Sequence, residues 1–379
     1  MIQQLIDRYK RLRTERFLAQ TYQYSYAFVG MGQHSLTNLY PVLHYLSVPL
    51  KYICVTSERK VQLIKRKFPH VKATTSLDMI LNDDAVKGVF VSASPSAHFS
   101  IASQILKSGK SLFIEKPPCQ TLRELDALID QQRLYGSPVA MVGLQKRYAP
   151  AVQILRKHLG KEHLISYELH YLTGAYPEGN VLLDLYIHPL DLVCFLFGKP
   201  EIIACQQVAP ASYILMLRHP HIVGTLELSA SYTWTTAEES LKVCTSKGIY
   251  RLSQMEELTF ESKPSTILGI PIEKVHKHNK IIEYLYARNN FIPTLPNNQI
   301  YTQGYFNELS AFIDTVEGHK VNITSSIETT KETYQLIEEY EKVSKFRNPN
   351  KLEENFLKIL KSAFTLHLVF AIVLKISGL

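Results

Sequence analysis

A glycine motif near the N-terminus has the residue types and spacing that suit a phosphate group. Gly30, Gly32 and Ser35 form a G-x-G-x-x-S motif that differs from the dinucleotide fingerprint only in its last position. The first glycine permits a tight turn, the second lets the backbone approach a pyrophosphate, and a following helix N-terminus supplies free N–H donors. A strand is expected before the motif and a helix after it, which favours cofactor binding over a simple glycine turn.

The end of the second expected strand bears on the choice of dinucleotide. Ser57 stands where NAD-selective sheets carry an acidic residue, and Arg59 and Lys60 follow it. A small hydroxyl beside positive charge leaves room for a 2′-phosphate, which favours NADP over NAD. Two alternatives stay open: Glu58 turned inward would reverse the preference, and Arg59 and Lys60 could simply begin a solvated helix.

The elements that carry these residues alternate between strand and helix. Five short apolar runs rich in Val, Ile, Phe and Tyr lie between residues 26 and 143, separated by longer helical stretches. This pattern predicts a doubly wound parallel sheet of the Rossmann type. After residue 149 we expect helices at 150–159 and 187–197 and a series of strands with short turns, which favours an antiparallel meander. Two later helices, at about 304–317 and 326–345, complete an α+β region with an open, mostly antiparallel sheet.

The length of 379 residues predicts two folded domains with short extensions. We place their bounds as follows: an amphipathic N-terminal extension at 1–24, a dinucleotide-binding Rossmann domain at 25–147, a substrate-binding α+β domain at 148–347, and an apolar helical tail at 348–379.

Charge and cysteine usage exclude several classes of protein. The formal net charge is +8, but the basic excess lies in residues 1–24 and 343–379 rather than on a binding face, which argues against a nucleic-acid partner. The five cysteines are widely spaced, so neither a disulfide framework nor a metal site is expected. Charges interrupt the N-terminal apolar residues, so no signal peptide is predicted, and a cytoplasmic location follows.

Four further motifs follow the glycine motif along the chain. They are Ser94-Pro95-Ser96-Ala97-His98, Glu115-Lys116-Pro117, the VGLQKRYAP segment around Arg147, and the D-x-x-x-H motif of Asp184 and His188. Each is weak alone, but their order and spacing are specific. Over residues 25–345 the sequence resembles the glucose-fructose oxidoreductase and inositol dehydrogenase (Gfo/Idh/MocA) family.

The resemblance implies a set of site residues. Catalytic roles fall to Lys116, Asp184 and His188: the imidazole takes a hydroxyl proton as hydride leaves the carbon, the lysine stabilises the developing alkoxide, and the carboxylate orients the pair. Taken alone, Asp184 and His188 would be a helix cap and a core histidine. The cofactor would contact Gly30, Gly32, Gln33, Ser35, Ser57, Arg59, Ser94, Pro95, His98, Glu115 and Lys116, and the substrate would contact Arg147, His188 and Tyr186.

The expected function is that of an NAD(P)-dependent oxidoreductase acting on a secondary hydroxyl or carbonyl of a sugar, cyclitol or sugar-nucleotide, as a homo-oligomer. The alternatives are an NAD-dependent glycosidase of the same family and a non-catalytic dinucleotide-binding regulator. Two departures from the family pattern stand near Asp184: Gly179-Asn180 replaces Gly-Gly, and Tyr186 replaces a small residue. The tyrosine would narrow the substrate pocket or repack the helix.

The C-terminal tail contains the apolar stretch AFTLHLVFAIVL at residues 363–374. This is shorter than the ~20 apolar residues of a bilayer span, so no transmembrane helix is expected. Docking of the tail onto the body or a second subunit is favoured over peripheral membrane contact through its flanking lysines.

Overall fold

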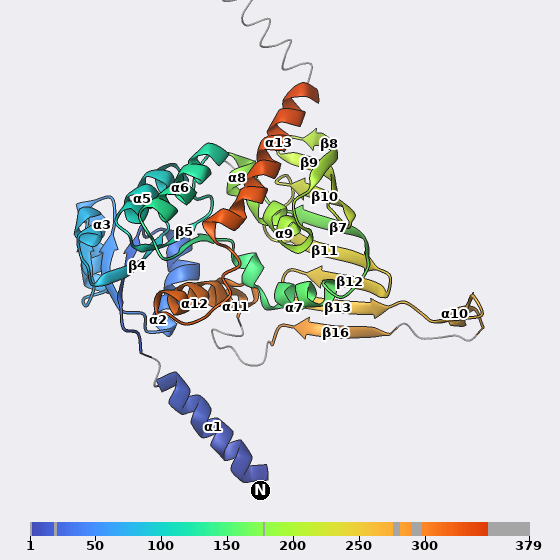
Figure 1. Ribbon diagram of the computed structural model, residues 1–379, viewed down its shortest axis with the longest axis horizontal. Coiled ribbons are helices and arrows are strands. Elements are labelled where there is room, and N and C mark those ends of the chain that lie inside the picture. The colour runs from blue at the N-terminus through green and yellow to red at the C-terminus, as the bar shows by residue number, and fades with distance from the viewer. Residues whose placement is uncertain (1, 19–20, 177–178, 276–280, 290–297, 348–379) are drawn as a thin grey trace, which may run out of the picture.

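The computed structural model describes residues 2–18, 21–176, 179–275, 281–289 and 298–347 (Figure 1). The expectation for the tail at 348–379 lies outside the described residues. No helix in the described part of the chain is long and apolar enough to cross a membrane.

The first sheet is parallel, as the apolar runs predicted, with the order β3-β2-β1-β4-β5-β6. Its strands are β1 (Ser25–Val29), β2 (Leu50–Cys54), β3 (Lys72–Thr74), β4 (Val86–Val91), β5 (Ser111–Glu115) and β6 (Ala140–Gly143). Between them run a π-helical turn at Ser35–Leu39, α2 (Tyr40–Tyr45), α3 (Glu58–Lys67), α4 (Asp78–Leu81), α5 (Pro95–Lys107) and α6 (Leu122–Leu134). The strands are buried along almost their whole length, which explains their continuous apolar runs.

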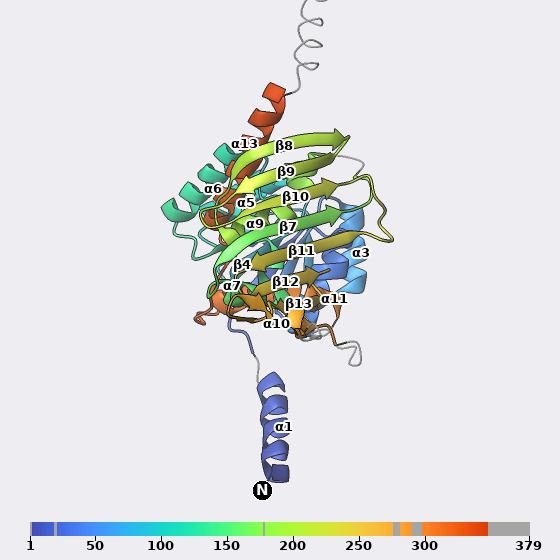
Figure 2. The same cartoon turned by 90° about the vertical axis from the view of Figure 1, so that its right-hand side faces the viewer.

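The second sheet has the order β16-β13-β12-β11-β7-β10-β9-β8 (Figure 2). Its strands are β7 (Leu164–Leu172), β8 (Glu201–Ala209), β9 (Ser212–Arg218), β10 (Val223–Ser229), β11 (Glu238–Thr245), β12 (Gly248–Ser253), β13 (Glu257–Ser262) and β16 (Ile282–Ala287). The expected mostly antiparallel sheet is confirmed, but it is not a simple meander. β7 lies between β10 and β11 and pairs with β10 in parallel, so the sheet is mixed.

The helices and turns after β6 pack on one or the other sheet and connect the two. These are a 3-10 turn at Gln145–Tyr148, α7 (Pro150–Leu159), α8 (Val181–Asp184), α9 (Ile187–Phe197), α11 (Gln299–Thr302), α12 (Tyr305–Val316), a 3-10 turn at Ile327–Thr330 and α13 (Lys331–Arg347). A small hairpin of β14 (Thr266–Ile267) and β15 (Ile270–Pro271) precedes α10 (Ile272–Val275).

The helix α12 covers a face of the first sheet, although it follows the second sheet in sequence (Figure 1). The ring of Phe312 lies 5.1 Å from that of Phe90 and 5.8 Å from that of Phe113, measured between centroids. Just beyond the helix, Glu317 accepts a hydrogen bond of 2.7 Å from the Tyr26 hydroxyl. The aromatic core of the first sheet therefore contains residues from both ends of the chain.

The helix α1 (Ile2–Leu18) projects away from the body of the molecule (Figure 1). The apolar side chains described between residues 2 and 12 are exposed, among them Ile2 at 76%, Leu5 at 61% and Tyr9 at 66%. The predicted N-terminal helix is thus present, with its apolar stripe uncovered in this single chain.

Candidate functional site

A cavity of about 510 Å³ opens at the carboxyl ends of β1, β2 and β4. This is the edge where open α/β sheets bind ligands. Of the residues predicted to contact a cofactor, the lining includes Gly30, Gly32, Gln33, Ser35 and Ser94. It is completed by Val29, Met31, His34, Cys54, Val55, Thr56, Lys60, Thr75, Leu77, Ser92, Ala93, Ala97 and Ile101.

Glycine suits positions 30 and 32 of the motif for different structural reasons. Gly30 has φ of +87°, and a Cβ there would lie 2.3 Å from the carbonyl oxygen of Ser92, so only glycine fits. A Cβ on Gly32 would meet no protein atom within 4 Å. Its bare backbone therefore faces open space in the cavity, which suits the close approach of a pyrophosphate.

Ser35 has a role of its own in place of the last glycine. It is fully buried, donates a hydrogen bond of 3.0 Å to the Ser92 hydroxyl and accepts one of 3.4 Å from the Gly32 amide. The hydroxyl thus ties the glycine turn to the loop after β4.

At the end of β2 the cation on the cavity lining is Lys60, whereas Ser57 and Arg59 do not belong to the lining formed by the described residues. Ser57 instead caps α3, because its Oγ accepts a hydrogen bond from the Lys60 amide at 3.4 Å. Glu58 does not belong to that lining either, but its Oε1 accepts a hydrogen bond of 3.2 Å from Thr75, which does.

Lys116 and Asp184 meet beyond β5. The lysine Nζ donates a hydrogen bond of 2.5 Å to the backbone carbonyl of Asp184. Burial lowers the pKa of Lys116, and the nearby Lys146 adds to that effect while Glu115 and Asp184 oppose it. The Asp184 carboxylate is 8% exposed and lies over Gly179, where a Cβ would be 2.2 Å from Oδ2. Burial raises the pKa of this carboxyl.

The departure at Gly179-Asn180 has a local explanation. The Asn180 side chain caps the short helix α8 by accepting hydrogen bonds from the amides of Leu182 and Leu183, at 3.0 and 3.4 Å. The helix breaks at Leu185, so Asp184 ends α8 and His188 lies in the first turn of α9.

His188 lies in the field of Lys116, Lys146 and His34. Burial, followed by these three groups, lowers the pKa of His188 well below the usual value for histidine. The imidazole is therefore neutral at neutral pH and able to accept a proton.

Two pairs at this site were not found by sequence reasoning. Lys146 forms a buried ion pair with Glu239 at the start of β11, and its Nζ lies 4.7 Å from the ring centroid of Tyr171. His34 Nε2 lies 3.2 Å from Glu115 Oε1 and so connects the cavity at the glycine motif with the segment that carries Lys116. Lys146 lies in the VGLQKRYAP segment and His34 in the glycine motif, so both could have been found from the sequence. No sequence motif surrounds Glu239.

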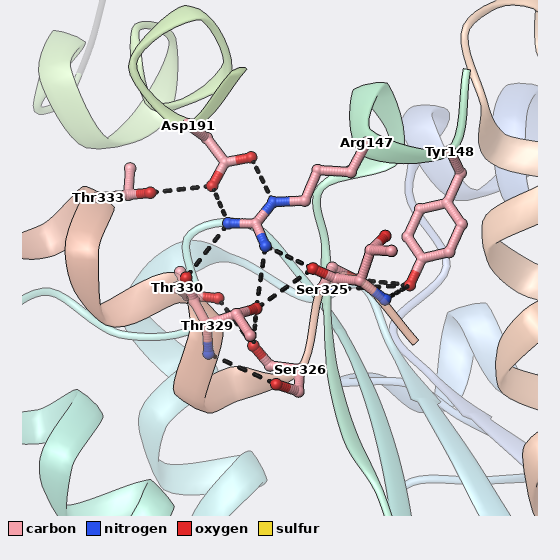
Figure 3. Close-up of polar contacts among 9 residues, drawn as sticks. Arg147, Tyr148, Asp191, Ser325, Ser326, Thr329, Thr330 and Thr333 are labelled. Carbon is pink, nitrogen blue, oxygen red and sulfur yellow. Dashed lines mark hydrogen bonds and ion pairs between the residues drawn. The ribbon is translucent and has the colours of Figure 1, made fainter. Parts of the chain in front are cut away.

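Arg147 does not reach this site, contrary to the prediction that it binds substrate. All five of its N–H donors are used: two go to the carboxylate of Asp191, one to the carbonyl of Thr324, and two to Thr329 (Figure 3). Thr333 donates a further hydrogen bond of 2.9 Å to Asp191. The guanidinium therefore joins the segment after β6 to α9 and to the turn before α13.

Tyr186 fits the predicted repacking of the helix rather than a substrate contact, and both ring nitrogens of His98 lie against protein carbonyls. Tyr186 is fully buried and donates a hydrogen bond of 2.5 Å to the carbonyl of Ala211, so its bulk repacks the helix against the second sheet. His98 is 1% exposed, and its ring nitrogens lie 2.7 Å from the carbonyl oxygen of Pro117 and 3.1 Å from that of Ala93. The ring thus lies between the loop after β4 and the loop after β5. Neither His98 nor Pro95 is among the described residues that line the cavity.

Comparison with known proteins gives a family match for the first sheet. Residues 24–144 match the model of an oxidoreductase family with an NAD-binding Rossmann fold. The putative oxidoreductase YceM of Salmonella typhimurium is 26% identical over 48% of this chain and 61% of its own length. An inositol 2-dehydrogenase of the same organism is 24% identical over 38% of this chain and 45% of its own length. The chain thus spans about half the length of these curated relatives.

Solved structures share the fold across both sheets. Levoglucosan dehydrogenase in complex with NADH and L-sorbose superposes with a TM-score of 0.69 at 15% identity, over 83% of this chain and 95% of that one. This likeness extends the structural match beyond the first sheet.

Proposed function

Because residues 24–144 match the model of the Gfo/Idh/MocA oxidoreductase family, we propose that the chain is an NAD(P)-dependent dehydrogenase or reductase acting on a secondary hydroxyl or its carbonyl. The observation that carries this proposal is the meeting of Lys116, Asp184 and His188 beside the dinucleotide cavity. A protein that only binds a dinucleotide would not need Lys116, Lys146 and a neutral His188 in one buried site.

The residues that would hold the dinucleotide are Gly30, Gly32 and Ser35 at the pyrophosphate and Lys60 with Thr75 at the ribose. When bound, the nicotinamide ring accepts or supplies hydride at C4. The open backbone at Gly32 supports this placement. We further propose a preference for NADP, supported by Lys60 on the cavity lining, with Glu58, the hydrogen-bond partner of Thr75, as the opposing charge.

The protein's own groups would manage the proton. His188, held neutral by burial and nearby positive charge, takes the hydroxyl proton of the substrate. Lys116 has two N–H donors beyond the one on the Asp184 carbonyl, and these can stabilise the developing alkoxide. The Asp184 carboxylate provides compensating charge and orients the pair.

The substrate class we propose is a sugar, cyclitol or sugar-nucleotide. Relatives named inositol 2-dehydrogenase and a structural neighbour named levoglucosan dehydrogenase support polyhydroxylated rings. In the same proposal residues 25–147 bind the dinucleotide and residues 148–347 the substrate, in a cytoplasmic homo-oligomer. Exposed apolar residues on the outer face of β9 and β10, Ile214, Met216 and Val223, support association with a second copy.

The test begins with the mass of any nucleotide that co-purifies. Purified protein is then assayed at 340 nm with NAD⁺ or NADP⁺ and a panel of myo-inositol, levoglucosan and UDP-N-acetylglucosamine, and in reverse with the matching ketones. Reduction of the nicotinamide that requires both Lys116 and His188 supports the proposal. Dinucleotide binding without turnover of any polyhydroxylated ring would favour the regulator, and release of an aglycone from glycosides would favour the glycosidase.

A further inference from the structure

The chain contains one tryptophan, Trp234, and it is 60% exposed. It lies in the loop of residues 230–237 between β10 and β11. Tyr232, two residues earlier, is 51% exposed. Leaving an indole in water forgoes a large amount of apolar burial, so an indole fixed in an exposed position calls for a reason.

The indole of Trp234 rests directly on bare backbone. A Cβ on Gly174 would lie 2.3 Å from Trp234 Cδ1 and 2.4 Å from Nε1, so only glycine permits this contact. The loop itself is tied down, because Thr173 donates its amide to the Ser229 carbonyl at 2.7 Å and Tyr232 donates its amide to the Thr173 carbonyl at 3.0 Å. The Thr235 amide also donates to Thr233 Oγ1 at 3.0 Å. Trp234 is therefore held on a short, hydrogen-bonded loop.

This loop leaves the sheet at the edge that carries the candidate site. β7 and β10 are parallel and end together, with Leu172 paired to Ser229 (Figure 2). The chain after β7 passes Gly174 and Gly179 on its way to Asp184, and β11 begins at the same edge with Glu239, the partner of Lys146. Trp234 thus lies five residues before Glu239 and against the segment that leads to the catalytic carboxylate.

We propose that Trp234 is a specificity-determining residue that stacks on the C–H face of a sugar or cyclitol ring bound at Lys116 and His188. Such rings have a polar rim and an apolar face. An aromatic ring beneath the face leaves the rim hydroxyls free for Lys116, His188 and Lys146, and an indole with only two rotatable bonds loses little entropy. The inference rests on the dehydrogenase function proposed above.

Three variants test the contact with the ring, the need for an aromatic side chain and the support of the indole by Gly174. With whichever ring of the panel is turned over, Trp234→Ala should raise KM by about 3- to 10-fold while kcat changes less than about twofold. Trp234→Phe keeps an aromatic face and should recover much of that loss. Gly174→Ala should displace the indole and raise KM with the tryptophan still present. Tyr135→Ala, which removes another exposed aromatic residue at the C-terminal end of α6, is the matched control and should leave KM unchanged.

A spectroscopic readout follows from the single tryptophan. Titration of the wild-type protein with the turned-over ring should change the tryptophan emission over the concentration range of KM, and Trp234→Phe should abolish the signal. Unchanged emission at saturating ring, or an unchanged KM in both Trp234→Ala and Gly174→Ala with normal NADH binding, would overturn the proposal. If no ring is turned over by the wild type, the dehydrogenase function itself fails and this inference falls with it.

Discussion

Three basic side chains, Lys116, Lys146 and His188, are buried close together at the candidate site. Burial lowers the pKa of Lys116, of Lys146 and of His188, while Glu115, Glu239 and Asp184 supply negative charge around them. Lys146 is paired with Glu239 and Lys116 is hydrogen-bonded to the Asp184 carbonyl, so His188 is the group that is neutral. This division of roles gives an acceptor for a proton beside a donor for an oxyanion.

Removing either proposed catalytic group should abolish most of the rate without unfolding the protein. We expect Lys116→Ala and His188→Ala each to lower kcat by ~10²- to 10⁴-fold, because a positioned acid or base is lost. Steady-state assays with the true substrate, beside NADH binding and thermal melting, measure the effect. Full activity in either variant with normal cofactor binding would rule out the mechanism.

The pH profile should report the lowered pKa of His188. A base must be neutral to accept a proton, so its protonation as pH falls should cut the oxidation rate only well below pH ~6.5, the ordinary value for histidine. Lys146→Met removes a positive charge near the ring, which should raise the pKa of His188 and move the acid limb of kcat/KM to higher pH. Lys242→Met, which alters a lysine paired with Glu168 on an exposed face, should leave the limb in place.

Cofactor preference should depend on Lys60 more than on Arg59. Of these two residues Lys60 lines the cavity and Arg59 does not, so Lys60→Ala should weaken NADPH binding and leave NADH binding nearly unchanged. The sequence interpretation instead expects this effect from Arg59→Ala. Parallel titrations of both variants with both cofactors decide between the two residues, and equal curves for NADPH and NADH in the wild type would remove the argument for either.

At the scale of elements, short motifs predicted the backbone far better than they predicted side-chain direction. The alternation of strands and helices, the glycine turn and the helix at 150–159 follow from local pattern, and the structure has all of them. The short strand β3 has no counterpart among the five predicted apolar runs. Arg147 and Tyr186 stand beside site residues in sequence, yet both face inward, because that choice depends on Asp191 and Ala211 from other elements. The place of β7 between β10 and β11 likewise depends on pairing between distant strands.

The glycine turn offers a test that separates folding from binding. Gly32→Ala adds a methyl group to open space and should fold normally while it weakens dinucleotide binding. Gly30→Ala places its methyl 2.3 Å from a backbone carbonyl at positive φ, so it should lower the melting temperature as well. Thermal melting and NADH titration of both variants measure this difference. Tight NADH binding by Gly32→Ala would place the pyrophosphate elsewhere.

For the whole molecule, the Arg147 and Asp191 pair connects segments from three parts of the chain (Figure 3). Both side chains are 3% exposed. Arg147→Met or Asp191→Asn should lower the free energy of unfolding by about 3–5 kcal/mol, because each leaves a buried partner without compensation. Urea unfolding measures the loss. The double variant Arg147→Met/Asp191→Asn should lose less stability than the two single variants added together, and strict additivity would contradict the pairing.

The position of α12 has a consequence for synthesis of the chain. The aromatic face formed by Tyr26, Phe90 and Phe113 is complete only when Phe312 arrives, and β6 gains its bridge from Met141 to Ser326 later still. A ribosome adding ~5–20 residues per second needs on the order of 10 to 40 s to pass from β6 to that point. During this interval the nascent first sheet exposes aromatic surface and an unpaired edge strand, both of which invite aggregation. We therefore expect a ribosome-associated chaperone to bind the nascent chain during this interval and to leave it after α12 has emerged.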